Sequence, residues 1–311
     1  MNAGTHVLIA ANPKSGAASN QQKVTELCES LRAAGLTCET SSSLSHIQTE
    51  SRRLNDHGML RAVVAAGGDG TVDALVNLLD PAIRILIFPL GTENLLAKHW
   101  GLTNDVRSAC RTIQHGVPVS MDVGSANGKL FLVMLSCGFD AEVVRQMHAV
   151  RRGHINRWSY TGPILRALGK YRFPQISVKG IGQDDVEVDL GTTAWAFLFN
   201  VPRYAANLQF CPQANPTDGL LDLCLFRNSG ILPGTYYLSQ LWINRHQQMR
   251  GFSHVRLRSL ELAPIASSAV GSKNEIPFQI DGDPGGVLPI RVELLPSRLT
   301  LLIDSQSKLS C

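Results

Sequence analysis

Residues 63–77 read VVAAGGDGTVDALVN, and the order of residue types in this stretch decides the fold. Four apolar residues run directly into GGDGT at 67–71, and an amphipathic segment begins at Val72. This order predicts a buried strand, a glycine-rich turn and the start of a helix. Glycines let backbone N–H groups approach an anion, and a helix N-terminus adds its positive dipole end. The stretch therefore predicts a phosphate-binding turn, with an ordinary strand–turn–helix corner as the alternative.

One carboxylate, that of Asp69, falls inside this predicted turn. A carboxylate beside phosphates is repelled unless a cation lies between them. Mg²⁺ prefers oxygen ligands of this kind and usually bridges one or two carboxylates to substrate phosphates. The sequence therefore predicts Mg²⁺ as a cofactor beside the bound phosphates.

Length and composition describe a globular protein with a mild positive charge. The 311 residues suggest about two domains, and 44% hydrophobic with 17% charged residues is ordinary for a chain with a real core. The net charge of +4 is too small to argue by itself for a nucleic-acid partner, and none is expected. The charge is compatible with an anionic substrate or an anionic lipid surface.

The cysteines and apolar runs point to a cytoplasmic protein. The seven cysteines are scattered, with no CxxC or Cys/His cluster along the sequence, so neither a zinc site nor a disulfide framework is expected. The N-terminus lacks the pattern of a signal peptide. No run approaches 18 apolar residues, so no transmembrane segment is predicted. The expected localisation is the cytoplasm, with the inner face of the membrane as a further option.

Strands and helices alternate over the first part of the chain. The predicted strands are 6–11, 36–40, 63–66 and 83–89, and the predicted helices are 20–34, 47–56, a segment from about 72, a segment from about 95, and 103–115. This alternation predicts a doubly wound parallel sheet, whose ligands bind at the carboxyl ends of the strands. Three polar turns, 12–16, 67–71 and 91–94, follow strands and should share that edge.

The pattern changes after Gly124, where short strands dominate. The predicted strands are 129–136, 175–180, 186–190, 193–200, 220–226, 254–262, 276–281, 290–295 and 299–304, with helical spacing at 141–172 and 232–247. We therefore expect an α/β nucleotide-binding domain over 1–124 and a β-rich substrate domain over 125–298, built as a sandwich or flattened barrel. The segment 299–311 can return to the first domain. A cleft between the two domains is expected.

Five motifs occur in order along the chain: NPKSG at 12–16, GGDGT at 67–71, PLGTENLLAKH at 89–99, DGLLD at 218–222 and QIDGD at 279–283. With these motifs the sequence resembles the diacylglycerol kinase catalytic-domain family, in particular its soluble bacterial lipid kinases. The resemblance implies a nucleotide-binding domain followed by a β-sandwich domain, with the active site between them. It also implies transfer of the γ-phosphate of ATP to a lipid hydroxyl, that of diacylglycerol, phosphatidylglycerol or a sphingoid base.

The resemblance assigns a set of nucleotide contacts to this sequence. They are Asn12, Pro13, Lys14, Ser15, Gly16, Thr40, Gly67, Gly68, Asp69, Gly70, Thr71, Val72, Thr92 and Asn94. Asp69 would hold Mg²⁺ directly or through water, and so belongs to the catalytic set as well. For individual side chains the alternative is a simple turn or a solvated loop.

Asp281 is the candidate general base, because it occupies the first position of the family's DGE element. A lipid hydroxyl is a poor nucleophile and needs a positioned carboxylate to take its proton during phosphoryl transfer. From the residues alone, IDGD at 280–283 reads as a tight hairpin turn.

The resemblance further implies metal ligands in the second half of the chain. Asp218, with backbone carbonyls near Asn215 and Leu220, corresponds to a structural Mg²⁺ site, and a plain turn is the alternative reading. Asp283 replaces the glutamate of the family's DGE element and belongs with Asp69 in the expected metal set. Asp122 would join the water network around the catalytic metal.

Departures from the family pattern keep other functions open. Leu95 stands where many members have an aspartate, and Asp73 stands where an asparagine is usual. An NAD kinase-like enzyme, which shares GGDGT, and a non-catalytic nucleotide- or lipid-binding regulator are the alternatives. A basic cluster over 145–172, with Trp158, Tyr160 and Tyr171, suits either peripheral membrane contact or a solvated helix face. A homodimer is one option for the oligomeric state.

Overall fold

The computed structural model describes residues 4–11, 18–150, 171–204, 208–243, 245–265 and 275–304. The chain divides into two compact units. Unit 1 comprises Met1–Val123 and Pro296–Cys311, and unit 2 comprises Gly124–Leu295.

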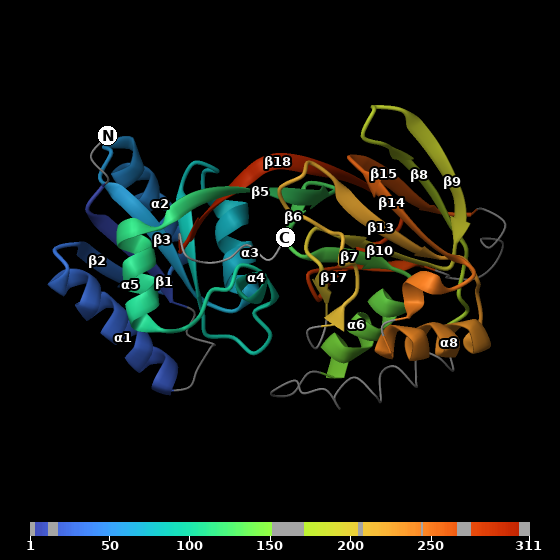
Figure 1. The fold of residues 1–311 in the computed structure, drawn as a ribbon, viewed down its shortest axis with the longest axis horizontal. Helices are drawn as coiled ribbons and strands as arrows, with labels where there is room; N and C mark the ends of the chain where they lie inside the picture. Colours follow the sequence, from blue (N-terminus) through green and yellow to red (C-terminus); the bar gives the residue numbers. More distant parts are fainter. Residues whose placement is uncertain are drawn as a thin grey trace. The chain divides into compact units, whose positions relative to one another are not determined.

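Unit 1 is built on a parallel sheet with the strand order β2-β1-β3-β4-β18 (Figure 1). The strands are β1 His6–Ala11, β2 Thr37–Ser41, β3 Leu60–Gly67, β4 Arg84–Pro89 and the last part of β18 Ile290–Ile303. The helices are α1 Ala18–Ala33, α2 Leu44–Asp56, α3 Asp69–Leu78, α4 Leu95–His99 and α5 Val106–His115.

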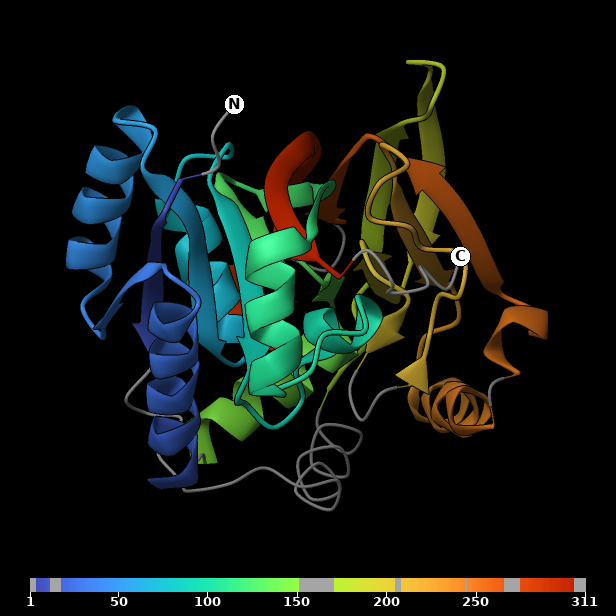
Figure 2. The same ribbon diagram turned by 60° about the vertical axis from the view of Figure 1, so that its left-hand side comes forward.

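Helices cover both faces of this sheet. Figure 2 shows α1 and α5 side by side over one face, where Leu27 and Ile113 pack on Ile9 in one apolar cluster. Helices α2 and α3 contact each other and strand β3 as well. Strands covered on both faces read as continuous apolar runs, which explains the uninterrupted run at 62–66.

The sheet order places the ends of β3 and β4 next to each other. The register pairs Gly67 with Pro89, so the turns at 67–71 and 91–94 leave the sheet at one edge. Strand β1 runs parallel to β3, and its end, Ala11, pairs with Ala66. The third predicted turn, 12–16, lies outside the described residues.

Unit 2 contains two large antiparallel sheets and a short one formed by β11 Arg203–Tyr204 and β12 Leu208–Gln209. One large sheet has the order β14-β13-β10-β7-β16-β17, and the other contains the first part of β18 followed by β15, β8 and β9. Their strands are β7 Met134–Cys137, β8 Ile176–Ile181, β9 Glu187–Thr193, β10 Trp195–Phe199, β13 Leu221–Phe226, β14 Phe252–Leu257, β15 Ser259–Pro264, β16 Pro277–Ile280 and β17 Asp283–Val287. Leu223 of β13 and Leu262 of β15 belong to one buried cluster, so the two sheets share a sandwich core.

The other face of the six-stranded sheet is aromatic. Trp195, Phe197 and Phe199 alternate along β10, and Phe226 stands opposite Trp195 on β13. Helix α6 Phe139–Val150 contacts β7 and β16, while Tyr237 of α8 Ile231–Trp242 stacks edge-on against Trp195 with ring centroids 5.6 Å apart. Both helices lie below this sheet in Figure 1.

The predicted fold class, a doubly wound α/β domain combined with a β-sandwich, is confirmed, whereas several element bounds were wrong. Helix α3 begins at Asp69, three residues before the predicted start. The predicted strand 254–262 is two strands, β14 and β15. The predicted strands 290–295 and 299–304 are one strand, β18, because Pro296 and Ser297 are accommodated within it, the latter at φ 51°.

Other strands were missing from the prediction or were merged in it. The predicted strand 129–136 is β6 Lys129–Phe131 followed by β7. Strand β5 Val117–Ala126 was missed. So was β17, because its sequence DPGGV carries the residues that usually mark a turn. Of the helix predicted over 141–172, α6 accounts for the part up to Val150, and residues 151–170 lie outside the described residues. Among the helices that the structure describes, none combines the length and apolar character needed to cross a membrane.

Candidate active site

The side chain of Asp69 connects the loop after β3 to the loop after β4 by hydrogen bonds. Its Oδ2 accepts a hydrogen bond from Leu95 N at 2.9 Å, and its Oδ1 accepts one from Leu96 N at 3.2 Å. These two N–H groups are the first of helix α4, so a side chain from α3 caps a neighbouring helix. A backbone bond from Leu90 N to Gly67 O, 2.8 Å long, joins the same loops at their base.

Glycine is required where these loops touch. A Cβ atom at Gly91 would lie 2.6 Å from the Cα of Gly68, and one at Gly67 would lie 2.1 Å from Oγ1 of Thr71. At Gly70 a Cβ atom would meet nothing within 4 Å. Gly91 therefore permits close packing of backbone, Gly67 leaves room for the Thr71 side chain, and Gly70 leaves an open surface at the first turn of α3. The first-turn N–H groups of a helix at such an open surface can bind an anion.

Asn94 is held in a strained backbone conformation beside this junction. Its φ of 48° is left-handed, and its Nδ2 donates to Gly91 O at 2.7 Å. Its Oδ1 is buried and has no hydrogen-bond partner among the described residues. Such an orphaned acceptor is suited to a donor or a cation supplied by a ligand.

The electrostatic environment of Asp69 is mixed. Burial raises the pKa of its carboxyl group, while the N–H groups of Leu95 and Leu96 and the charge of Lys98 act in the opposite direction. Asp69 and Asn94 together offer oxygen atoms, the ligand type that Mg²⁺ prefers. The residues thus fit a hard cation by type, although Leu95 contributes no carboxylate.

The other predicted nucleotide contacts differ in accessibility. Thr40, near the end of β2, and Thr92 are exposed, and Thr71 is buried. Val72 is fully buried in the core, so its side chain cannot contact a nucleotide. The contacts predicted at Asn12, Pro13, Lys14, Ser15 and Gly16 lie outside the described residues.

Asp281 is held rigidly in unit 2 by backbone donors. Its carboxylate accepts three N–H bonds, from Leu132 at 2.7 Å, Val133 at 2.9 Å and Met134 at 2.8 Å. The residue has a φ of 49° in the turn between β16 and β17, and its own N–H bonds Met134 O at 3.0 Å. The hairpin turn that the sequence suggests is therefore present, and it orients the carboxylate.

A hydrogen-bond network beneath this turn was missed by the sequence analysis. Gln279 accepts from Gly282 N at 2.7 Å and donates to Ser136 Oγ at 3.0 Å. Ser136 and Tyr204 both donate to Asp140. Burial raises the pKa of this carboxyl group, and the two hydrogen bonds act in the opposite direction. The only signal in the sequence is the position of Asp140, just after a strand and Gly138.

The remaining predicted metal ligands have protein partners of their own. Asp283 forms an ion pair with His148 at 3.0 Å, and buried Asp122 accepts from Ser297 N at 2.8 Å. Asp218 accepts from Leu220 N at 3.0 Å and from Arg256 Nη1 at 3.2 Å.

The predicted structural metal site is therefore shared with a guanidinium group. Asn215 O accepts from Asp218 N at 3.4 Å, so the carbonyl closes a turn. A cation at Asp218 would compete with Arg256 for the carboxylate, and the oxygen donors fit Mg²⁺ only if that ion pair opens.

The close approach of the two loops leads to a stability prediction. Gly91→Ala forces the new methyl group into the Gly68 backbone, and we expect a loss of about 2 kcal/mol in the free energy of unfolding, measured by urea denaturation. Gly70→Ala is the matched control, because it adds a methyl group to open space within a helix and should be neutral or stabilising. Equal stabilities of the two variants would contradict the proposed packing.

Two family models match the chain, one over each half. The diacylglycerol kinase catalytic domain matches residues 6–126. The YegS C-terminal NAD kinase beta sandwich-like domain matches residues 133–303, more than half of the chain. The two matches meet close to the boundary between units 1 and 2.

Individual relatives agree with these models. A "probable lipid kinase YegS-like" of Shewanella frigidimarina is 26% identical over 251 residues, which is 78% of this chain and 76% of that protein. The diacylglycerol kinase of Bacillus subtilis is 22% identical over 287 residues, 89% of each chain. A crystal structure of a diacylglycerol kinase from Bacillus anthracis superposes with a TM-score of 0.68 at 20% identity, covering 98% of this chain and 99% of that one.

The match to both halves of the chain has a direct consequence. The loops after β3 and β4 lie in the half matched by the catalytic-domain model, and the Asp281 turn lies in the half matched by the sandwich model. The chain therefore belongs to the diacylglycerol kinase-like family of lipid kinases, phosphotransferases that act on an alcohol group.

Proposed function

We propose that the protein transfers the γ-phosphate of ATP to the free hydroxyl of diacylglycerol or a related lipid, with Mg²⁺ as cofactor. Related acceptors are phosphatidylglycerol and sphingoid bases. The observation that carries this proposal is the pair of loops after β3 and β4, which Asp69 joins at the N-terminus of α3. An enzyme of the lipid kinase family needs such a site for the phosphates of its donor.

The donor phosphates would meet backbone N–H groups and the positive end of the α3 dipole. Asp69 and Asn94 would hold Mg²⁺ through oxygen atoms, and Asp283 stays in the proposed metal set. When bound, Mg²⁺ neutralises the charge that develops on the transferring phosphoryl group. Thr40, Thr92 and the segment 12–16 remain proposed contacts of the nucleotide.

Asp281 is the proposed general base. Three backbone N–H bonds hold its carboxylate in one orientation. Asp281 would take the hydroxyl proton while the oxygen attacks the γ-phosphorus.

A peripheral membrane contact through α8 would give access to the acceptor. Four large apolar residues on and just after this helix are strongly exposed: Ile231 (52%), Leu232 (81%), Tyr236 (52%) and Ile243 (54%). Leu232, Tyr236 and Ile243 have the four- and seven-residue spacing of one helix face. An exposed apolar helix face of this kind can lie in the interface of a bilayer.

The basic cluster at 145–172 contributes less to this proposal. Arg145 forms an ion pair with Glu142 at 2.8 Å. Tyr171 packs against Phe139 and Phe173, with ring centroids 6.1 and 5.3 Å away, rather than standing at a polar interface. Residues 151–170, with Trp158 and Tyr160, lie outside the described residues.

A phosphotransfer assay tests the function directly. Purified protein is incubated with γ-labelled ATP, Mg²⁺ and micelles that contain diacylglycerol, phosphatidylglycerol or sphingosine, and with NAD in a parallel reaction. We expect label in a lipid product. Labelled NADP would favour an NAD kinase-like enzyme, and ATP binding with no labelled product would favour a non-catalytic regulator.

Asp281→Asn should lower kcat by about 10²–10⁴-fold, because the variant cannot accept the proton. ATP affinity, measured by calorimetry, should stay unchanged. The new amide also faces a backbone N–H, so we expect about 1–3 kcal/mol less stability. Val292→Ala removes two methyl groups from the buried sandwich core and is the control for lost stability. It should keep the wild-type kcat at a temperature where both variants are folded. A turnover close to wild type for Asp281→Asn would remove Asp281 as the base.

Leu232→Asp should weaken binding to phosphatidylglycerol vesicles, measured by co-sedimentation, because it places a charge on the exposed face of α8. Val186→Asp is the matched control, since Val186 is 57% exposed but lies in the β8–β9 turn. Equal vesicle binding of the wild type and both variants would exclude α8 as the contact.

A further inference from the structure

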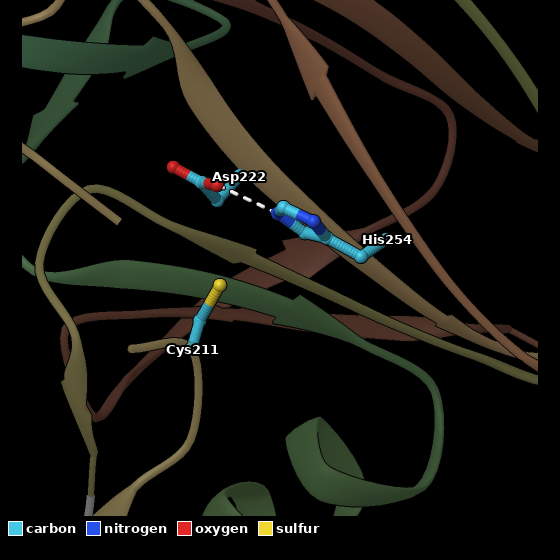
Figure 3. Close-up of side chains that lie close together, drawn as sticks. All are labelled: Cys211, Asp222 and His254. Atoms are coloured by element: carbon cyan, nitrogen blue, oxygen red, sulfur yellow. Dashed lines mark hydrogen bonds and ion pairs between the residues drawn. The ribbon is translucent and has the colours of Figure 1, made fainter. Parts of the chain in front are cut away.

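Four potential metal ligands gather on the aromatic face of the six-stranded sheet. Asp222 and Cys224 are two residues apart on β13, so their side chains share a face. His254 of β14 is the register partner of Cys224 and points to the same side. Cys211 approaches from the segment that follows β12 Leu208–Gln209, and Figure 3 shows its sulfur directed toward Asp222 and His254.

The ligand atoms are close enough to surround one ion. One atom from each of Cys211, Asp222 and His254 lies within 4.8 Å of the other two. His254 Nε2 and Asp222 Oδ1 are 2.6 Å apart. Zinc–ligand bonds of about 2.0–2.3 Å place neighbouring ligand atoms roughly 3.5 Å apart, so small side-chain rotations suffice. Cys224 stands opposite His254 in the register of β13 and β14, next to this group.

An unsatisfied carboxylate oxygen is the second observation. Asp222 is 0% exposed, and its Oδ2 has no hydrogen-bond partner within the described part of the chain. A buried carboxylate oxygen that accepts no hydrogen bond costs stability, and a bound cation is one of the few partners that can satisfy it.

The surroundings of these polar groups are largely aromatic. Asp222 pairs with Phe199 and Cys224 pairs with Phe197 across the sheet, and Phe210 precedes Cys211 in the chain. An aromatic core would be filled equally well by apolar side chains. The thiolate is the metal-binding form of cysteine.

We propose that Cys211, Asp222 and His254, with Cys224 as the fourth ligand, form a site for a divalent transition-metal ion of the zinc type. Two sulfurs, one imidazole and one carboxylate are soft and borderline ligands that favour Zn²⁺ over Mg²⁺. Binding displaces protons from the imidazole and from the thiols that carry them, and no redox step is involved. The ion would tie the segment after β12 to strands β13 and β14. The sequence analysis expected no zinc site because it tested only local spacing, whereas these residues lie up to 43 positions apart, from 211 to 254.

Cobalt is the probe for this site, because a thiolate bound to Co²⁺ gives a charge-transfer absorption in the near ultraviolet. The full chain is reduced, freed of metal and titrated with Co²⁺. We expect one equivalent to bind with this absorption, and Zn²⁺, but not Mg²⁺, to remove it. Cys211→Ser should weaken the band, because one of the two thiolate ligands is lost, and His254→Gln should weaken Co²⁺ affinity at least about tenfold. Cys110→Ser, a partly exposed cysteine of α5, is the matched control and should titrate like the wild type.

The absence of stoichiometric Co²⁺ absorption in the wild type would overturn the proposal, as would an undiminished band in Cys211→Ser. Circular dichroism checks that the variants are folded. If Cys211→Ser does not fold, the wild-type titration and Asp222→Asn still decide, because loss of the carboxylate should weaken Co²⁺ binding while the thiolate band persists. Unchanged affinity in Asp222→Asn would contradict the ligand set. None of these readouts requires kinase activity, so this proposal and the proposed function fail independently.

Discussion

The contact between the carboxylate of Asp69 and the first N–H groups of α4 is the interaction on which the proposed donor site depends. It lets one side chain do two things, because it joins the loops after β3 and β4 and also satisfies helix-end donors that would otherwise be unpaired. Glycine is needed at 91 because the two loops approach there backbone against backbone. The sequence analysis interpreted Asp69 as a metal ligand; the structure adds that it is first a positioning group.

In unit 2 the carboxylate of Asp281 is likewise held by backbone N–H groups. There, three consecutive N–H groups between β6 and β7 hold a carboxylate that stands in a left-handed turn. Asp69 and Asp281 are thus both held by backbone donors, whose positions do not depend on flexible side chains. A carboxylate held in this way is restricted in orientation before any substrate arrives, which is the preorganisation that general-base chemistry needs.

Local patterns in the sequence predicted much of unit 1 and less of unit 2. Buried strands such as β3 are continuous apolar runs, and the turn that follows β3 has a distinctive composition. By contrast, the sequence of β17 is typical of a loop, and that of β18 is typical of two strands. Both segments form strands nevertheless, because pairing with neighbouring strands overrides the preferences of proline and glycine there. The network of Ser136, Asp140 and Gln279 could not be predicted, since it joins residues up to 143 positions apart. The cluster around Asp222 was missed for the same reason.

Strand β18 also bears on the order in which the chain can fold. Its residues Thr300 and Leu301 pair with β4, so the sheet of unit 1 is completed by a segment synthesised after all of unit 2. Until that segment leaves the ribosome, β4 has an unpaired edge, whereas unit 2 is contiguous and can already form its sandwich. The unit that is encoded first is therefore completed last, and the sheet that carries the proposed donor site is not finished in a nascent chain until its final strand is in place.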